Sequence, residues 1–228
     1  MKMGSKVPVM FALASVALLG ACSETRPLTS IRESARYYDN VGEYDKALPE
    51  YRAFLANKPE DTELRYEYAS ALLKNGQYAE ARDQFLLLTD ITPTDERFAD
   101  GYARSLFETG NNAEVTAYLN RMTVQRGSVG DWLRMGDYCQ KTGDVDGAKA
   151  AYRKAAKVDG GRSTKPWIAM ADMFAGLNDK ANERAMIERA LYIEPMSPAL
   201  SERYKKLGGM PGPTAGVRPE EWVAPKTK

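Results

Sequence analysis

The sequence predicts an all-α protein in which pairs of antiparallel helices repeat along the chain and stack into a solenoid. One observation behind this is a period, because the stretches 42–59 and 76–93 align at a spacing of 34 residues. The other is that small and aromatic residues keep fixed offsets inside each period. A constant period of this size is typical of stacked helix-turn-helix repeats. The matched pairs are Gly42 with Gly76, Tyr44 with Tyr78, Ala47 with Ala81, Tyr51 with Phe85, and Pro59 with Pro93.

The spacing has a physical reason. Two antiparallel helices need a small residue where their backbones approach and a bulky residue to fill the gap beside it. Ala47 and Ala81 are the predicted close-approach sites, and Tyr51 and Phe85 are the predicted wedges. The glycine allows a positive φ in the turn between the two helices, and the proline ends the second helix.

The pattern resembles the tetratricopeptide repeat (TPR) family. The resemblance extends over about residues 20–207 and implies a TPR-type α-solenoid, a right-handed superhelix of about five helix-turn-helix repeats with a C-terminal capping helix. It also implies that the first helix of each repeat lines the concave face. The expected repeats are 28–61, 62–95, 96–128, 129–162 and 163–196, followed by the capping helix within 197–207.

Two of these repeats depart from the pattern. The third has Val115 where alanine is expected and Gly127 where the proline would fall. The fifth has no turn glycine, and Glu183 occupies its small-residue position. A terminal repeat is often atypical, because one of its sides does not face another repeat. Ser197-Pro198 is a good helix start, with an N-cap residue before proline at the first helical position.

The N-terminus has the layout of a bacterial lipoprotein signal peptide. Lys2 and Lys6 precede an uncharged run, Val7–Leu19, which is too short to span a bilayer comfortably. The sequence Leu19-Gly20-Ala21-Cys22 then resembles a lipobox, and this resemblance implies cleavage after residue 21 and lipidation of Cys22. Residues 1–21 are thus expected to be the signal peptide and 22–27 a lipidated tether.

The same segment has two alternative interpretations, an ordinary signal peptide with a chance cysteine and an N-terminal anchor that is never cut. Ser23 follows Cys22, whereas in the family an aspartate at that position usually retains lipoproteins at the inner membrane. The expected location is therefore the outer membrane, facing the periplasm.

Composition excludes several function classes. The 228 residues contain 32 basic and 31 acidic side chains, and this balance argues against a nucleic-acid binder. Histidine is absent, which removes the commonest general base and metal ligand. Cys22 and Cys139 are far apart, and Cys139 is best interpreted as a small buried hydrophobe. We therefore expect no catalytic residues, no metal and no cofactor.

The predicted binding surface is the concave groove. Its residues are the positions of the first helices that point away from their partner helices, counted from the offsets of the resembled family. The predicted set is Arg32, Arg36, Tyr66, Ser70, Leu73, Arg104, Phe107, Leu133 and Asp137, and the same count places Asp39, Asp100 and Gln140 on this face.

The apolar members of this set would anchor an extended peptide or a partner helix, and the charged members would fix its register. The alternative is that these side chains pack against neighbouring repeats. The TPR class that grips a C-terminal carboxylate uses lysine and asparagine at such sites. Here Arg32, Arg36, Tyr66 and Ser70 occupy them, which argues against that ligand.

The last segment, 208–228, contains four prolines and four glycines and shows no helical period. It is expected to be a flexible tail. Trp222-Val223 is an apolar pair near its end, which could dock on a partner or fold back onto the solenoid.

Taken together, the sequence resembles TPR lipoproteins of pilus and secretion assembly, such as the TadD-like and pilotin-like proteins. The expected function is a membrane-anchored scaffold that binds a protein or peptide partner in its groove. A structural subunit of an outer-membrane complex, contacting through its convex face or tail, is the first alternative. A periplasmic hydrolase is the second, and it would need a catalytic set without histidine.

Overall fold

The computed structural model describes residues 26–223, and within this range it confirms the predicted all-α fold. Eleven helices follow one another without a strand in the described residues. Their bounds are α1 Leu28–Asn40, α2 Tyr44–Asn57, α3 Thr62–Lys74, α4 Tyr78–Ile91, α5 Glu96–Glu108, α6 Asn112–Gln125, α7 Val129–Lys141, α8 Val145–Asp159, α9 Lys165–Gly176, α10 Lys180–Ile193 and α11 Pro198–Lys206.

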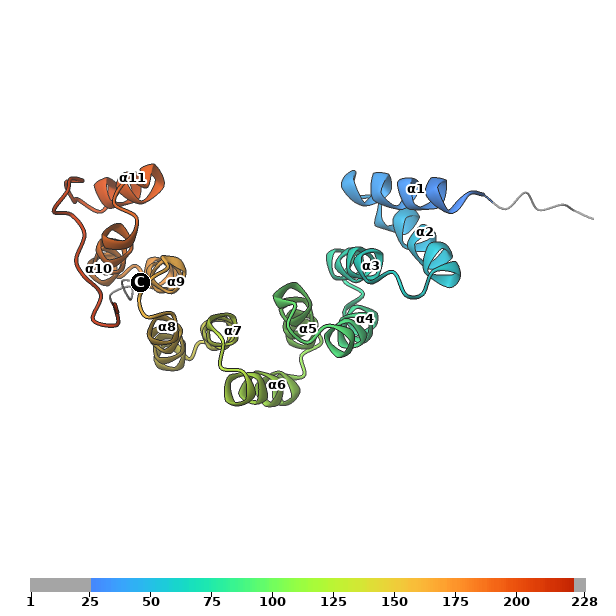
Figure 1. Ribbon diagram of the computed structural model, residues 1–228, viewed down its shortest axis with the longest axis horizontal. Coiled ribbons are helices and arrows are strands. Elements are labelled where there is room, and N and C mark those ends of the chain that lie inside the picture. The colour runs from blue at the N-terminus through green and yellow to red at the C-terminus, as the bar shows by residue number, and fades with distance from the viewer. Residues whose placement is uncertain (1–25, 224–228) are drawn as a thin grey trace, which may run out of the picture.

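The helices stack in chain order into an open arc (Figure 1). The odd-numbered helices α3, α5, α7 and α9 lie on the inner side of the arc, and the even-numbered helices lie on the outer side. Helix α1 stands at one end and α11 at the other. Each helix packs against its neighbours in sequence, and α3, α5, α7 and α9 also contact one another along the inner side. A curved stack of this kind has a concave surface built from one helix of every pair.

Left-handed residues make the turns within the repeats. Gly42 has a φ of 80°, and the amide of Glu43 donates to the carbonyl of Tyr38 across the turn. In the fifth repeat Asn178 takes the same role with a φ of 58°. Asparagine is among the few residues that tolerate this region, so the repeat keeps its turn without a glycine.

Aromatic side chains pack beside small residues between the helices, as the spacing predicts. Ala47 and Ala81 are fully buried, and so are the rings of Tyr51 and Phe85. The structure adds a glycine to this scheme, because a Cβ atom on Gly101 would lie 2.1 Å from the ring of Phe85. Close backbone approach at such sites holds consecutive helices together.

The departures in the third and fifth repeats have visible consequences. Val115 is buried in its small-residue position, and α5 contacts α6 less extensively than the paired helices of the other repeats contact each other. Glu183 is also buried, and it accepts a hydrogen bond of 2.8 Å from Arg203 of the capping helix α11. The charge at the small-residue position of the last repeat is thus neutralised by the cap.

The segment after α11 differs from the predicted flexible tail. Residues 208–223 lie against the outer helix α10 and the turn between α8 and α9 (Figure 1). Ala215 is buried, and the amides of Val217 and Val223 donate to the carbonyls of Glu188 and Gly160. Glycine and proline prevent a helix here, but they do not prevent an extended chain from packing on a preformed surface.

The predicted signal peptide 1–21, Cys22 and most of the tether lie outside the described residues. Among residues 26–223, no helix combines the length and the apolar character that a membrane span requires.

Candidate functional site: the concave groove

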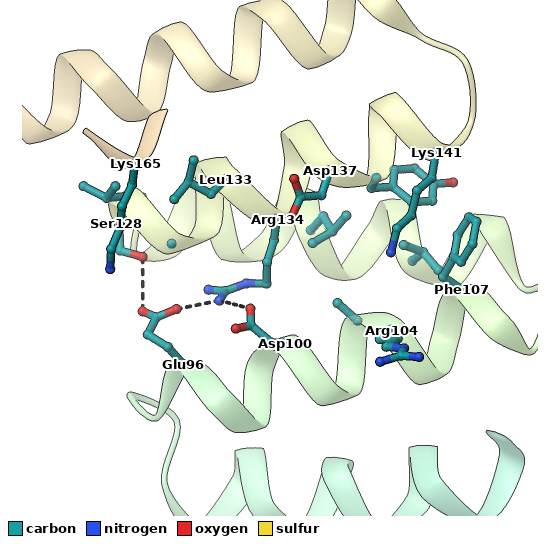
Figure 2. A pocket seen from close by; sticks show the side chains of 16 residues that line it. Glu96, Asp100, Arg104, Phe107, Ser128, Leu133, Arg134, Asp137, Lys141 and Lys165 are labelled. Atoms are coloured by element: carbon teal, nitrogen blue, oxygen red, sulfur yellow. Dashed lines mark hydrogen bonds and ion pairs between the residues drawn. The ribbon is translucent and has the colours of Figure 1, made fainter. Parts of the chain in front are cut away.

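Two adjoining hollows run along the concave face. One, of about 610 Å³, lies between α5 and α7 and is called the α5–α7 hollow (Figure 2). The other, of about 510 Å³, lies between α3 and α5 and is called the α3–α5 hollow. Asp100 and Arg104 line both of them. The two hollows are therefore parts of one groove that crosses at least three inner helices.

The floor of the α5–α7 hollow is apolar. It is reached by Val115 and Leu119 of the outer helix α6, because α5 and α6 approach each other less closely than the other pairs. Phe107 and Tyr138 meet edge to face across the hollow, with ring centroids 6.2 Å apart. The ammonium group of Lys141 lies 5.2 Å from the ring centroid of Phe107. The irregular third repeat thus forms an apolar depression with a cation beside it.

A buried arginine fixes the charge pattern on one side of this hollow. Arg134 is only 7% exposed, and its guanidinium lies 2.5 Å from Glu96, 2.7 Å from Asp100 and 2.7 Å from Asp131. Burial works to lower its pKa, but the three carboxylates outweigh that effect and raise it, so the side chain stays charged. Figure 2 shows Arg134 between the carboxylates of Glu96 and Asp100.

Asp131 connects this arginine to the start of α7. Its side chain and that of Ser128 form a capping box, and Arg126 donates to both of its carboxylate oxygens. The carboxylate is fully buried. Burial works to raise its pKa, but hydrogen bonds from Arg126, Arg134 and Ser128 outweigh burial and lower it. Asp131 therefore remains ionised between two arginines.

Asp137 lies farther along α7 and takes part in a different network. The hydroxyl of Tyr152 donates to Asp137 at 2.7 Å and contacts Gln140 at 3.0 Å. Loss of surrounding water raises the pKa of Asp137, while the hydrogen bond from Tyr152 works in the opposite direction. Asp137 is nevertheless an exposed residue of the groove wall, so its carboxylate is accessible to a bound partner.

The α3–α5 hollow has an aromatic wall and a rim of ion pairs. Tyr66 packs against Phe85 and Phe98, and the guanidinium of Arg97 lies 4.8 Å from the Tyr66 ring centroid. Arg97 also pairs with Glu63 at 3.0 Å. Two further pairs, Arg36 with Glu67 at 2.6 Å and Lys74 with Asp39 at 2.8 Å, link α1 to α3.

The structure places the predicted groove residues in two groups. Seven of the nine line at least one of the hollows: Tyr66, Ser70, Leu73, Arg104, Phe107, Leu133 and Asp137. Arg36 borders the groove through its pair with Glu67, and Arg32 lines neither hollow. Leu73 is almost completely buried, and Tyr66 lies in an aromatic cluster. For these two side chains the packing alternative describes the structure well.

Sequence reasoning missed Arg134, Glu96, Asp131 and Lys141 on the ionic side of the groove, although it included Asp100 among the concave positions. A signal for it exists in the repeat period. Glu63 and Arg97 are 34 residues apart, as are Asp100 and Arg134, and both pairs form ion pairs between consecutive inner helices. Opposite charges at equivalent positions of adjacent repeats therefore indicate which side chains meet along the concave face.

Two further expectations concern chemistry. Cys139 is half-buried, and burial raises its thiol pKa, which suits a packing role better than a reactive one. Within residues 26–223 no group of three or more cysteine, aspartate and glutamate side chains is placed to hold a metal ion.

Sequence comparisons assign the repeats. Two family models described as tetratricopeptide repeat match the chain, one over residues 32–96 and the other over residues 132–161. The chain contains tetratricopeptide repeats. The matched ranges cover the first, second and fourth repeats, in which the small and aromatic offsets are kept. No curated protein matches the chain.

Solved structures share the TPR fold. A thermophilic TPR protein of Thermus thermophilus is 19% identical with a TM-score of 0.51, and the match covers 79% of this chain and 98% of that one. A TPR protein of Parabacteroides merdae is 12% identical with a TM-score of 0.52, covering 79% and 72%. PilW, named a widely conserved type IV pilus biogenesis factor, is 17% identical with a TM-score of 0.53, covering 79% and 84%. At these identities the similarity establishes the fold.

Proposed function

We propose that this TPR solenoid is a protein-interaction scaffold that holds an extended segment of a partner protein in its concave groove. The observation that carries the proposal is the continuity of the two hollows, which share Asp100 and Arg104 and cross α3, α5 and α7. A groove that crosses several stacked helices fits a chain lying along the stack better than it fits a compact small molecule.

The lining supports binding through apolar anchors and charged guides. Phe107 and Leu133 offer apolar surface in the α5–α7 hollow, where Lys141 and Lys165 add positive charge. Buried apolar contacts supply most of the affinity in such interfaces, and charges at the rim set register and orientation. The partner segment is therefore expected to place an apolar side chain in this hollow, with a carboxylate near the lysines.

The carboxylates in the hollow take part in ion pairs and hydrogen bonds within the groove wall. Glu96 and Asp100 share the guanidinium of Arg134, and Asp137 accepts from Tyr152. A hydrolase that uses two carboxylates needs one as an acid and the other as a base or nucleophile. Because Glu96 and Asp100 are both engaged by one arginine, we infer that this pair has a structural role and that the groove is a binding surface.

Substitutions in the groove test this proposal. Phe107→Glu and Leu133→Glu each place a charge on the apolar floor, and each is expected to lower partner binding by about 2 kcal/mol or more, about 30-fold. The matched control is Val124→Glu on α6, because Val124 is 85% exposed and lines neither hollow. Affinity purification from cell envelopes, followed by titration of the recovered partner, measures the difference. Equal binding by all three variants would contradict binding in the groove.

We also propose that the scaffold is anchored by lipid at the periplasmic face of the outer membrane. The support is the lipobox-like sequence ending in Cys22 after a basic start and a short apolar run. Several acyl chains hold a protein far more firmly than one, since each buried methylene contributes about 0.8 kcal/mol. The proposed setting is pilus, secretion or outer-membrane assembly, because the fold of this chain is similar to that of PilW.

Metabolic labelling tests the anchor. The wild-type protein is expected to incorporate radioactive palmitate, and Cys22→Ser is expected to lose the label completely. Cys139→Ser is the control, because that thiol is half-buried in the solenoid and should leave labelling unchanged. An unlabelled wild-type protein would contradict lipidation and favour an ordinary signal peptide or an uncut anchor.

A second candidate function is a structural subunit that makes its contacts through the convex face or the tail. The position of residues 208–223 on the outer helix α10 favours this as the alternative, because the tail is already part of that surface. Deletion of 208–228 separates the two functions. A groove binder should keep its partner after the deletion, whereas a subunit that depends on its tail should lose it.

A further inference from the structure

The tail 215–223 fits its surface through close backbone contacts. A Cβ atom on Gly216 would lie 2.6 Å from Cα and N of Tyr192, so only glycine allows the tail to approach α10 here. Farther along, a Cβ atom on Gly161 would lie 2.8 Å from the backbone of Trp222. The Trp222 ring meets Tyr192 edge to face at 5.9 Å. These contacts fix the position of the tail backbone on α10 and on the turn at Gly161.

The surface beneath the tail carries positive charge. Residues 215–223 carry the two carboxylates of Glu220 and Glu221 and one cation, Arg218, whose guanidinium lies 4.4 Å from the Trp222 ring centroid. Lys149 and Arg153 of α8 and Arg189 of α10 line a hollow of about 60 Å³ together with Glu220 and Glu221. None of the three cations forms an ion pair with another residue in the part of the chain that the structure describes. Their charge is opposite in sign to that of Glu220 and Glu221, which line the same hollow without forming an ion pair with any of the three.

The wall of this hollow is apolar and contains one unused hydrogen-bond donor. Trp167, Met170 and Phe174 of α9 line it, and the Arg189 guanidinium lies 5.7 Å from the Trp167 ring centroid. Trp167 is 2% exposed, and its indole Nε1 has no hydrogen-bond partner among residues 26–223. The surface therefore combines aromatic contact area with three cations, a combination that favours an acidic ligand.

We propose that this surface, called the α8–α10 site, is a second peptide-docking site that is selective for an acidic segment followed by an aromatic residue. The protein's own sequence Glu220-Glu221-Trp222 lies over it in cis, with Glu220 and Glu221 lining the hollow and Trp222 packed against Tyr192. A partner that presents the same chemistry binds the α8–α10 site by displacing the tail. The site is formed by α8, α9, α10 and the turn at Gly160, and it shares no residue with the two hollows of the concave groove.

Displacement is feasible because the tail is held by few strong contacts. Two backbone hydrogen bonds, from Val217 to Glu188 and from Val223 to Gly160, hold it to the solenoid. A tethered ligand has an effective concentration in the millimolar range, so it reduces the apparent affinity of a competing peptide without abolishing binding. An external ligand therefore has to bind the α8–α10 site with enough affinity to compete with the tethered tail.

The test uses the full chain and a fluorescent peptide of residues 215–223 as the probe. Gly216→Ala should undock the tail, because the new methyl group meets the backbone of Tyr192. Gly212→Ala is the matched control, since its methyl group would meet nothing within 4 Å. Both positions follow the last helix, so neither substitution changes a residue of the solenoid. The probe should bind Gly216→Ala about tenfold more tightly than it binds the wild type or Gly212→Ala.

Charge reversal completes the experiment. Arg153→Glu in the Gly216→Ala chain should weaken probe binding about tenfold or more, and so should a probe with lysine in place of both glutamates. Equal affinity of the probe for Gly216→Ala and wild type would overturn the proposal. So would undiminished binding of the lysine-bearing probe, because the site would then not select for acidic ligands.

Discussion

Replacing Asp131 with alanine is expected to lower the free energy of unfolding by about 3–5 kcal/mol, the range found when one partner of a buried ion pair is removed. Asp131 is fully buried and lies between Arg126 and Arg134. Its loss leaves the buried Arg134 with only the exposed carboxylates of Glu96 and Asp100 and breaks the capping box at Ser128. Urea unfolding monitored by circular dichroism measures the change.

A control and a pH series distinguish this mechanism from general damage. Glu202→Ala removes an exposed, solvent-screened pair with Lys206 and should leave the unfolding curve nearly unchanged. Because the folded pKa of Asp131 lies below its unfolded value of about 3.9, its stabilising effect is fully present above that pH and is lost as the pH falls through the folded pKa. The difference between wild type and Asp131→Asn should therefore be constant at neutral pH and narrow in acid. A difference that stays constant down to about pH 2, well below the unfolded value, would contradict the proposed network.

Replacing Tyr152 with alanine is expected to cost about 3–5 kcal/mol, as for other large buried aromatic residues. The ring is fully buried between α7, α8 and α9, and its hydroxyl contacts Gln140 and donates to Asp137 on the groove wall. The substitution removes both the wedge and these hydrogen bonds. Tyr152→Phe retains the wedge and should cost only about 1 kcal/mol. Thermal unfolding of the two variants separates the packing effect from the hydrogen-bonding effect.

A double-mutant cycle with Gly136 tests whether Tyr152 acts as a wedge. A Cβ atom on Gly136 would lie 2.3 Å from the Tyr152 ring, so Gly136→Ala alone should cost about 1–3 kcal/mol through overpacking. In the Tyr152→Ala chain the same change should cost nothing or add stability, because the ring is gone and alanine favours helix. Additive effects of the two substitutions would show that the two sites do not constrain each other.

The periodic part of the fold can be predicted from the sequence because the two helices of most repeats pack through small and bulky residues at the same positions. Ala47 and Ala81 had to be small, and Tyr51 and Phe85 had to fill the space beside them, so their spacing alone is enough to predict helix pairs. The concave positions follow from the same count, and Phe107 and Leu133 do line the groove.

The rest depends on contacts between repeats, which a count within one repeat does not contain. Within its own repeat, Arg134 has the pattern of a charged residue on a helix surface. Its role is visible only when Asp100, one period earlier, is placed beside it. A glutamate at the small-residue position of a repeat is unfavourable by itself. Glu183 is accommodated there because Arg203 of the capping helix donates a hydrogen bond to it. The composition of residues 208–223 predicts a flexible chain, and only the shape of α10 beside Gly216 shows why it packs.

The concave groove is expected to hold the partner, and site-specific photo-crosslinking in intact cells tests this most directly. The photoreactive residue is placed at Ser70 in the α3–α5 hollow, at Leu133 in the α5–α7 hollow, or at Val124 on the exposed side of α6. We predict the same discrete adduct from positions 70 and 133 and none from position 124. An adduct from position 124 with none from the two groove positions would contradict binding in the groove.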